Sequence, residues 1–304
     1  MATDSTPALD AIDSWQRLNV DEKCGSTLWH YTDAAGLVGI LKSGRLWATH
    51  VAHLNDPTEV IHGENLAEAL GNNLAWPKAQ ANACRALKKF CEGWGDQRLS
   101  SIVDLFTVSF CQDDGNRLSQ WRGYGGAGLG YSIGFKNVNI GPDSSSLTFK
   151  VAYEQGPSMK QLDKIFRKIL IAIEDDISGG ADAGRTVKKG VEKMSEIASL
   201  ISLKLKHGGF KEEREWRLIA FASEPSEVGR ISTTQYRAAK QGIVPYVEVN
   251  LTDKSNRLPI KRIFVGPAHD ATASLRAVKG LLTSLNYPNP EELVQSSAIP
   301  FRPL

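Results

Sequence analysis

The sequence predicts an α+β fold in which a split or twisted, mostly antiparallel sheet is flanked by helices. Short runs with the alternation of strands are scattered along the chain, and helical patterns of different lengths separate them. The regular succession of strand, helix and strand that indicates a doubly wound sheet does not occur. With 304 residues, 41% of them hydrophobic, the chain can build one large core, and we expect a single domain over 1–304.

The first predicted unit is a strand over 28–32, a helix that ends at Gly44, and a strand over 45–50. Thr32 or Asp33 can cap the helix, and Gly44 stands where a left-handed residue is favoured. Residues two apart in a strand share a face, so His30 and Thr32 point the same way. They would lie beside a helix N-terminus, whose free N–H groups favour a polar or anionic ligand.

The motif LNDPTE follows, with Asp56 as an N-cap and Pro57 as the first helical residue. Helices are expected from Pro57 to about Leu70 and from Pro77 to about Glu92. A metal site is not favoured here, because the proline and the cap interrupt any continuous helical face through the candidate ligands. Those candidates are His50, His53, Asp56, Glu59 and His62.

The middle of the chain alternates strands and a glycine-rich loop. Strands are predicted over 105–112 and 131–135, joined by the polar loop DDGNRLSQWRGYGGAGLG. Residues 123–128 match the dinucleotide pattern GxGxxG by letter, but they lead into a strand and not into a helix. Trp121, Arg122 and Tyr124 offer planar groups and one fixed charge, and either hold the loop in place or contact a ligand.

The second half resumes the sheet after a helical insertion. A strand over 147–153 precedes helical patterns from about 159 to 205, divided by SGGADAG, so a helical insertion is expected over 156–208. Further strands are predicted over 213–221, 243–251 and 260–265, then a helix over about 272–285 and a strand near 299–302.

The stretch FKEEREWRLIAF (210–221) carries two carboxylates of interest. In a strand, Glu213 and Glu215 would share a face at a separation of about 6–7 Å, close enough to hold a polar group between them. The alternative is a solvated strand end, which is the usual place for clustered charges.

Composition gives no overall sign of a nucleic-acid or membrane partner, although a local basic patch stays possible. A formal net charge of +2 gives no global field for nucleic acid or membrane, and no apolar run reaches the length of a membrane span. The N-terminus lacks the pattern of a signal peptide, so a cytoplasmic location is expected. The four cysteines have no metal-ligand spacing, and reduced thiols are expected.

Five blocks in order give the chain a family resemblance: LWHYTDAAGLVGILKSGRLWATH, LNDPTE, SQWRGYGGAGLGYSIGF, FKEEREWRLI and IKRIFVGP. The chain resembles the bacterial family called domain of unknown function 2971, which is distantly similar to the ADP-ribosyltransferase fold. The resemblance implies a split sheet of that type and NAD as substrate, without a metal.

The resemblance also implies a set of site residues. His30-Tyr31-Thr32 matches the His-x-Thr strand that binds NAD, and Glu215, with Glu213 before it, matches the Glu-x-Glu of a later strand. A Tyr or Ser that packs on nicotinamide would be Tyr124, with Ser109 behind it, and Trp121 would add a second planar group. Arg122 would neutralise the pyrophosphate.

Chemistry gives these residues their roles. Cleavage of the nicotinamide–ribose bond develops positive charge on the ribose, and Glu215 would stabilise that charge and hold the 2′-hydroxyl. Glu213 would orient or deprotonate the nucleophile, and His30 and Thr32 would hold hydroxyl groups of NAD.

Three functions are consistent with this interpretation. The first is an ADP-ribosyltransferase that modifies a protein or nucleic acid, in a toxin or antiphage effector, for which an antitoxin or regulator is a further expected partner. The second is an NAD glycohydrolase with the same site. The third is a module that keeps the fold and binds a nucleotide or nucleic acid without chemistry.

Overall fold

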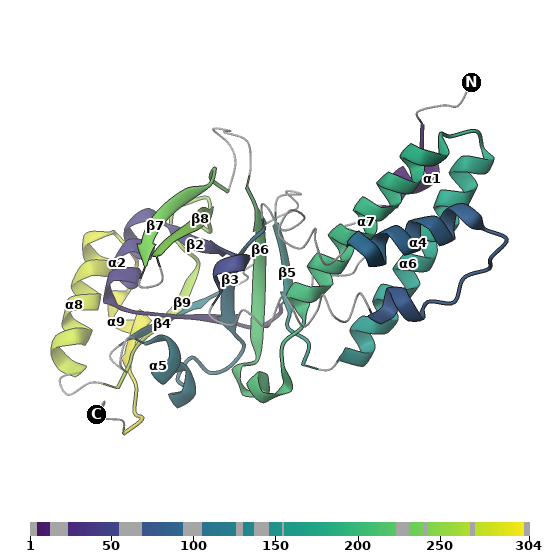
Figure 1. The fold of residues 1–304 in the computed structure, drawn as a ribbon. Helices are drawn as coiled ribbons and strands as arrows, with labels where there is room; N and C mark the ends of the chain where they lie inside the picture. Colours follow the sequence, from purple (N-terminus) through teal and green to yellow (C-terminus); the bar gives the residue numbers. More distant parts are fainter. Residues whose placement is uncertain are drawn as a thin grey trace. The chain divides into compact units, whose positions relative to one another are not determined.

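The computed structural model describes most of the chain and divides it into two compact units (Figure 1). The described residues are 5–12, 24–54, 69–93, 105–125, 130–136, 146–153, 155–222, 231–239, 242–267 and 271–300. The helical unit comprises Met1–Asp21, Val51–Asp104 and Val151–Phe210, and the sheet unit comprises Glu22–His50, Leu105–Lys150 and Lys211–Leu304. The predicted insertion over 156–208 falls within the helical unit, which also takes in two earlier segments.

The helical unit contains α1 (Pro7–Asp10), the short 3-10 turn η1 (Val51–His53), α4 (Ala81–Gly93), α6 (Gln155–Ser178) and α7 (Ala183–Lys204). The last two confirm the predicted helical pair, and Asp182 caps α7 by accepting a hydrogen bond from the Arg185 backbone N–H. Phe90 of α4 packs edge-on against Phe166 of α6, at a ring-centroid distance of 5.0 Å. The helix predicted from Pro57 and its cap at Asp56 lie outside the described residues.

The described residues of the sheet unit form ten strands, mostly antiparallel. They are β1 (Leu28–Thr32), β2 (Arg45–His50), β3 (Leu105–Cys111), β4 (Tyr131–Phe135), β5 (Ser146–Lys150), β6 (Glu215–Phe221), β7 (Gln235–Ala239), β8 (Gly242–Asn250), β9 (Ile260–Val265) and β10 (Val294–Ser296). The main path runs β10-β9-β4-β1-β3-β2-β8-β7, and β6 pairs with β3 and β5. This confirms a mixed α+β fold with a mostly antiparallel sheet.

The sheet divides at β3. One edge of β3 pairs along its whole length with β6. Its other edge is shared, because Thr107 pairs with Thr49 of β2 and Cys111 pairs with Trp29 of β1. Strands β1 and β2 therefore separate at the level of Ser109, which lies between the two pairs.

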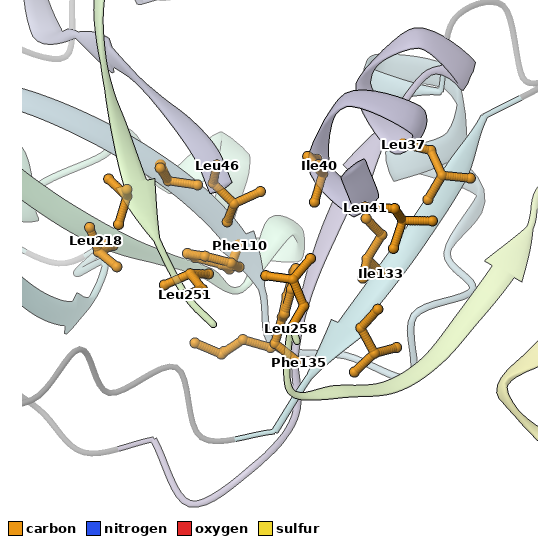
Figure 2. Close-up of a cluster of buried hydrophobic side chains, with 14 of the residues drawn as sticks. Leu37, Ile40, Leu41, Leu46, Phe110, Ile133, Phe135, Leu218, Leu251 and Leu258 are labelled. Atoms are coloured by element: carbon orange, nitrogen blue, oxygen red, sulfur yellow. The ribbon is translucent and has the colours of Figure 1, made fainter. Parts of the chain in front are cut away.

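The larger core of the sheet unit lies on one face of the sheet, under α2 (Ala34–Ser43) and α8 (Ala271–Ser284) (Figure 2). Leu28, Phe110 and Leu218 show that this face includes β1, β3 and β6. A second cluster packs on the opposite face and contains Trp29, Tyr31, Cys111 and Trp121. Helix α2 ends as predicted, with Gly44 in the left-handed conformation at φ 69°.

Strand β5 ends at Lys150, three residues before its predicted end, and α4 begins at Ala81, four residues after Pro77. Four further elements differ from the sequence predictions. Residues 118–124 form the helix α5 (Leu118–Tyr124), not a loop. Strand β6 begins at Glu215, because Gly208–Glu213 forms the 3-10 helix η2 and Arg214 has φ 46°. Strand β7 was not predicted, and the last strand lies at Val294–Ser296 after the short helix α9 (Pro290–Leu293). In the described part of the chain, no helix is long and apolar enough to cross a membrane.

Candidate functional site

His30 lies where the sheet divides. In an antiparallel strand, the backbone groups of alternate residues point to the same edge. On β3, Thr107 pairs with Thr49 of β2 and Cys111 pairs with Trp29 of β1. The carbonyl of Ser109, which lies between them, therefore points into the space between β1 and β2. The Nδ1 atom of His30 lies 3.1 Å from that carbonyl oxygen and donates a hydrogen bond to it. Its ring also packs against Phe110, with centroids 5.9 Å apart. The His30 side chain thus supplies the Ser109 carbonyl with the hydrogen bond that a backbone N–H of a neighbouring strand would otherwise donate.

This environment favours the neutral imidazole. Burial lowers the pKa of His30, and the hydrogen bond to Ser109 opposes that shift. Since a carbonyl oxygen only accepts, Nδ1 carries the proton and Nε2 presents a lone pair. Among the described residues, His30 Nε2 has no hydrogen-bond partner. The ring can therefore accept a hydrogen bond from a hydroxyl group of a ligand.

Ser109 also contacts the ion pair that Glu215 and Arg217 form on β6. Its hydroxyl donates to Glu215 Oε1 at 2.7 Å. Arg217 binds the same carboxylate through two bonds, from Nε to Oε1 at 2.8 Å and from Nη2 to Oε2 at 3.1 Å. Both charged side chains are buried. A paired arginine holds the carboxylate ionised and in a fixed orientation.

His30 and Glu215 approach Ser109 from opposite sides of β3, whereas a shared NAD site would require both to line one cleft. Directly paired residues of neighbouring strands point to the same face of the sheet. Glu215 and Trp29 both pair with Cys111, so the side chains of all three lie on one face. His30 points to the other side, where its ring meets Phe110. The two residues are joined through Ser109, whose carbonyl accepts from His30 and whose hydroxyl donates to Glu215.

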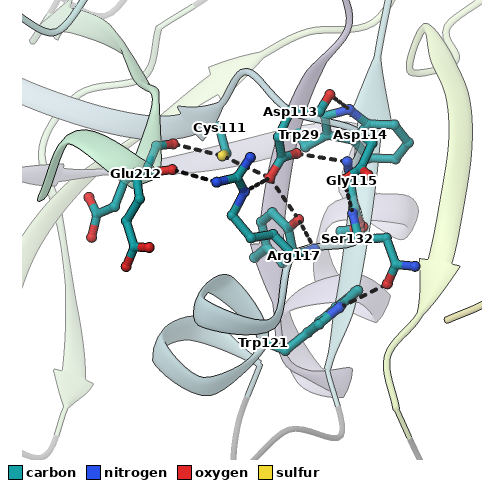
Figure 3. A network of polar contacts seen from close by, with 12 residues as sticks. Trp29, Cys111, Asp113, Asp114, Gly115, Arg117, Trp121, Ser132 and Glu212 are labelled. Atoms are coloured by element: carbon teal, nitrogen blue, oxygen red, sulfur yellow. Dashed lines mark hydrogen bonds and ion pairs between the residues drawn. The ribbon is translucent and has the colours of Figure 1, made fainter. Parts of the chain in front are cut away.

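Glu213 does not share a strand face with Glu215, because it belongs to η2 and the positive φ of Arg214 interrupts the alternation. The backbone carbonyl of Glu213 accepts a hydrogen bond from Cys111 Sγ at 2.7 Å, and that of Glu212 accepts one from Arg117 Nη1 at 3.1 Å. Figure 3 shows the Glu212 carbonyl directed toward Arg117 and the Glu212 carboxylate directed away from this network. The turn that precedes Glu215 is thereby fixed through its backbone.

Asp113 is the centre of that network (Figure 3). Its Oδ2 accepts from Tyr31, Cys111 and Arg117 at 3.1–3.3 Å, and its Oδ1 accepts from the Gly115 backbone N–H at 2.7 Å. Burial, followed by the charge of Asp113, raises the pKa of both Tyr31 and the Cys111 thiol. Cys111 is therefore a neutral thiol, and a nucleophilic role is not supported. Tyr31, expected in a ligand site, is instead a buried member of this network.

The remaining predicted residues fall into two groups. Trp121 is completely buried against Tyr31, with ring centroids 4.9 Å apart, so its predicted contact with a ligand is not available. Arg122 and Tyr124 are exposed on α5. Thr32 is partly exposed, and its Oγ1 lies so close to Gly36 that a side chain there would collide with it. Thr32 thus lies beside the N-terminus of α2, as predicted.

Sequence reasoning missed the contribution of Arg217 and Asp113. Arg217 lies two residues after Glu215, so strand alternation does place it on the same face. Asp113 lies in the polar loop after β3; its partners Cys111, Gly115 and Arg117 are within four residues of it, and only Tyr31 is distant in the sequence. Among the described residues, no group of three or more His, Cys, Asp or Glu side chains could hold a metal ion.

The fold and the site define an α+β protein whose antiparallel sheet divides at a serine that contacts a histidine and a paired glutamate. A family model described as a protein of unknown function (DUF2971) matches residues 120–218, and this match supports the family resemblance that the motifs indicated. The matched region includes Arg122, Tyr124 and Glu215, whereas His30 and Ser109 precede it. Comparison with curated proteins and with solved structures gives no significant match.

Proposed function

We propose that the sheet unit binds NAD where β1 and β2 separate and transfers ADP-ribose to a macromolecule. The observation that carries this proposal is the chain of contacts from His30 through Ser109 to Glu215. His30 comes from β1, Ser109 from β3 and Glu215 from β6. Strands β1 and β6 correspond to the His strand and the Glu strand that the resemblance to ADP-ribosyltransferases requires. The proposal thus rests on the order of these strands and on their contacts through Ser109, while His30 and Glu215 themselves lie on opposite sides of β3.

Each residue has a role in the proposed reaction. The lone pair of His30 Nε2 would accept a hydrogen bond from a hydroxyl of NAD. The Glu215 carboxylate, kept ionised by Arg217, would stabilise positive charge as the nicotinamide–ribose bond breaks and the bonding electrons leave with nicotinamide. Arg122, exposed on α5, would face the pyrophosphate. A nucleophile of the acceptor would then form the new bond to the ribose, and its proton would pass to a base.

Two alternatives use the same site. With water as nucleophile, the protein would be an NAD glycohydrolase. A binding module without chemistry is favoured by one observation, which is that His30 and Glu215 lie on opposite sides of β3 while Glu215 is buried in its pair with Arg217. In that case the buried ion pair would serve to specify the fold.

The test is nicotinamide release from NAD by the purified full chain, with and without a cell lysate. We expect release by the wild type and a loss of at least about a hundredfold in Glu215→Gln, since the glutamine keeps the shape and loses the charge. Dependence on lysate would assign a transferase, and release without lysate would assign a glycohydrolase.

Glu212→Gln is the matched control, because Glu212 is exposed and contributes only its backbone carbonyl to the network. Circular dichroism of each variant separates lost chemistry from lost folding. If Glu215→Gln does not fold, His30→Asn provides the test, because asparagine can still donate to Ser109 but offers no Nε2 lone pair. A folded wild type that releases no nicotinamide and is not stabilised by NAD would replace the transferase with the binding module.

A further inference from the structure

A cluster of two aromatic rings and a guanidinium covers one face of β2, β8 and β7. Trp47 and Tyr246 lie with ring centroids 4.7 Å apart, and the Arg237 guanidinium carbon lies 5.3 Å from the Trp47 centroid and 5.8 Å from the Tyr246 centroid. Strand pairing places all three on the same face, because Tyr246 pairs with Thr49 of β2 and with Gln235 of β7. Trp47 remains 47% exposed, which is unusual for an indole in a sheet.

Arg237 is not neutralised within the described part of the chain. Its Nη2 donates to Thr49 Oγ1 at 2.9 Å, and no carboxylate there forms an ion pair with it. Its Nε is buried without a hydrogen-bond partner. Burial lowers the pKa of Arg237, although a guanidinium stays charged at neutral pH. A partly buried cation without a counter-charge is costly, and an anionic ligand would offset that cost.

The same face continues toward the site on β3. Thr49, which contacts Arg237, pairs with Thr107, and Thr107 precedes Ser109 by two residues on β3. The Thr107 hydroxyl is buried and, among the described residues, also lacks a hydrogen-bond partner. Polar groups in need of a partner thus extend from Arg237 toward Ser109.

We propose that Trp47, Tyr246 and Arg237 form a subsite for one nucleotide unit, with a base stacked on the outer face of Trp47 and a phosphate against Arg237. The exposed indole matches the way in which aromatic side chains bind unpaired bases. The unpaired guanidinium supplies the fixed charge that a phosphate requires. The nucleotide unit belongs either to a single strand of nucleic acid or to a free nucleotide.

The experiment measures binding without NAD, so its result is independent of the proposed transferase activity. The probes are a fluorescein-labelled single-stranded oligonucleotide of mixed sequence, followed by fluorescence anisotropy, and AMP as a competitor. We expect Trp47→Leu to weaken binding about 5- to 100-fold, which corresponds to the loss of one stacked base. Arg237→Gln should weaken binding and reduce the slope of log affinity against log salt by about 1.

Tyr236→Ser is the matched control, because Tyr236 is 68% exposed and lies on the opposite face of β7. It should leave the affinity unchanged. Displacement of the oligonucleotide by AMP, or binding of AMP alone, would support the subsite with a free nucleotide as ligand. Oligonucleotide binding that AMP does not displace would support it with a strand as ligand. The proposal would be overturned if the wild type bound neither the oligonucleotide nor AMP, or if wild type and Trp47→Leu bound the oligonucleotide with equal affinity.

Discussion

His30 shows how one hydrogen bond sets the charge of a residue. Its folded-state pKa is lowered, so below about pH 6.5 the unfolded chain binds more protons at this position than the folded chain does. The neutral form therefore contributes stability that is present above about pH 6.5 and is lost as the pH falls through the folded pKa. We expect the free energy of unfolding of the wild type to fall between pH 7.5 and 5.5, as measured with urea.

His30→Asn should reduce that pH dependence, because asparagine can donate to the Ser109 carbonyl but does not titrate. His207 provides the control, since it is an exposed histidine of the helical unit. If His30→Asn and His207→Gln both keep the wild-type pH dependence, the depressed pKa of His30 does not contribute to stability.

For single residues, the sequence predicted which residue types belong to the candidate site better than it predicted where their side chains lie. The position of Thr32 beside the start of α2 follows from strand alternation and helix capping, and the structure confirms it. The separation of Glu213 from Glu215 could not be predicted from the sequence, because it depends on the positive φ of Arg214. Positive φ is rare for arginine, and no neighbouring residue indicates it. The burial of Trp121 depends on contacts with Tyr31, ninety residues earlier.

Two glycines of the α2 region give a matched pair for testing how the helix is specified. Gly44 has φ 69°, and a side chain there would collide with Thr252 Cγ2. Gly39 lies in the exposed helix interior, and a Cβ there would meet nothing within 4 Å. We expect Gly44→Ala to lower the free energy of unfolding by about 1–2 kcal/mol and Gly39→Ala to raise it by about 0.5–1 kcal/mol. Urea unfolding of both variants checks the opposite signs, and a stabilising Gly44→Ala would contradict the capping role.

The elements that the sequence predicted have strong local signals, and those that it missed depend on distant contacts. Strands β1, β2, β4 and β9 match their predicted bounds because alternation and turn residues mark them. Helix α5 is only seven residues long and contains Gly123, so its local preference is weak. Strand β7, QYRAA, is largely polar and exposed, and it is stabilised by pairing with β8.

At the scale of a whole unit, α6 organises the helices around it through two carboxylates. Glu174 accepts a hydrogen bond from the Ala83 backbone N–H in the first turn of α4, at 2.7 Å. Asp176 accepts from the backbone N–H groups of Ala8 and Leu9 in α1, at 2.8 and 2.9 Å. These contacts join residues 91 to 168 positions apart, so no local pattern in the sequence indicates them.

Asp176 therefore stabilises the N-terminal segment by occupying the free donors of α1, where a negative charge also opposes the positive end of the helix. Asp176→Ala would leave Leu9 N–H buried without a partner, and we expect a loss of about 1–3 kcal/mol in the free energy of unfolding. Hydrogen exchange should then become faster at Ala8 and Leu9 than in the wild type. Asp175→Ala is the control, because Asp175 is exposed on the same helix. Equal exchange in the two variants would show that α1 is held by the packing of Leu9 alone, and faster exchange confined to Asp176→Ala would assign the attachment of α1 to this carboxylate.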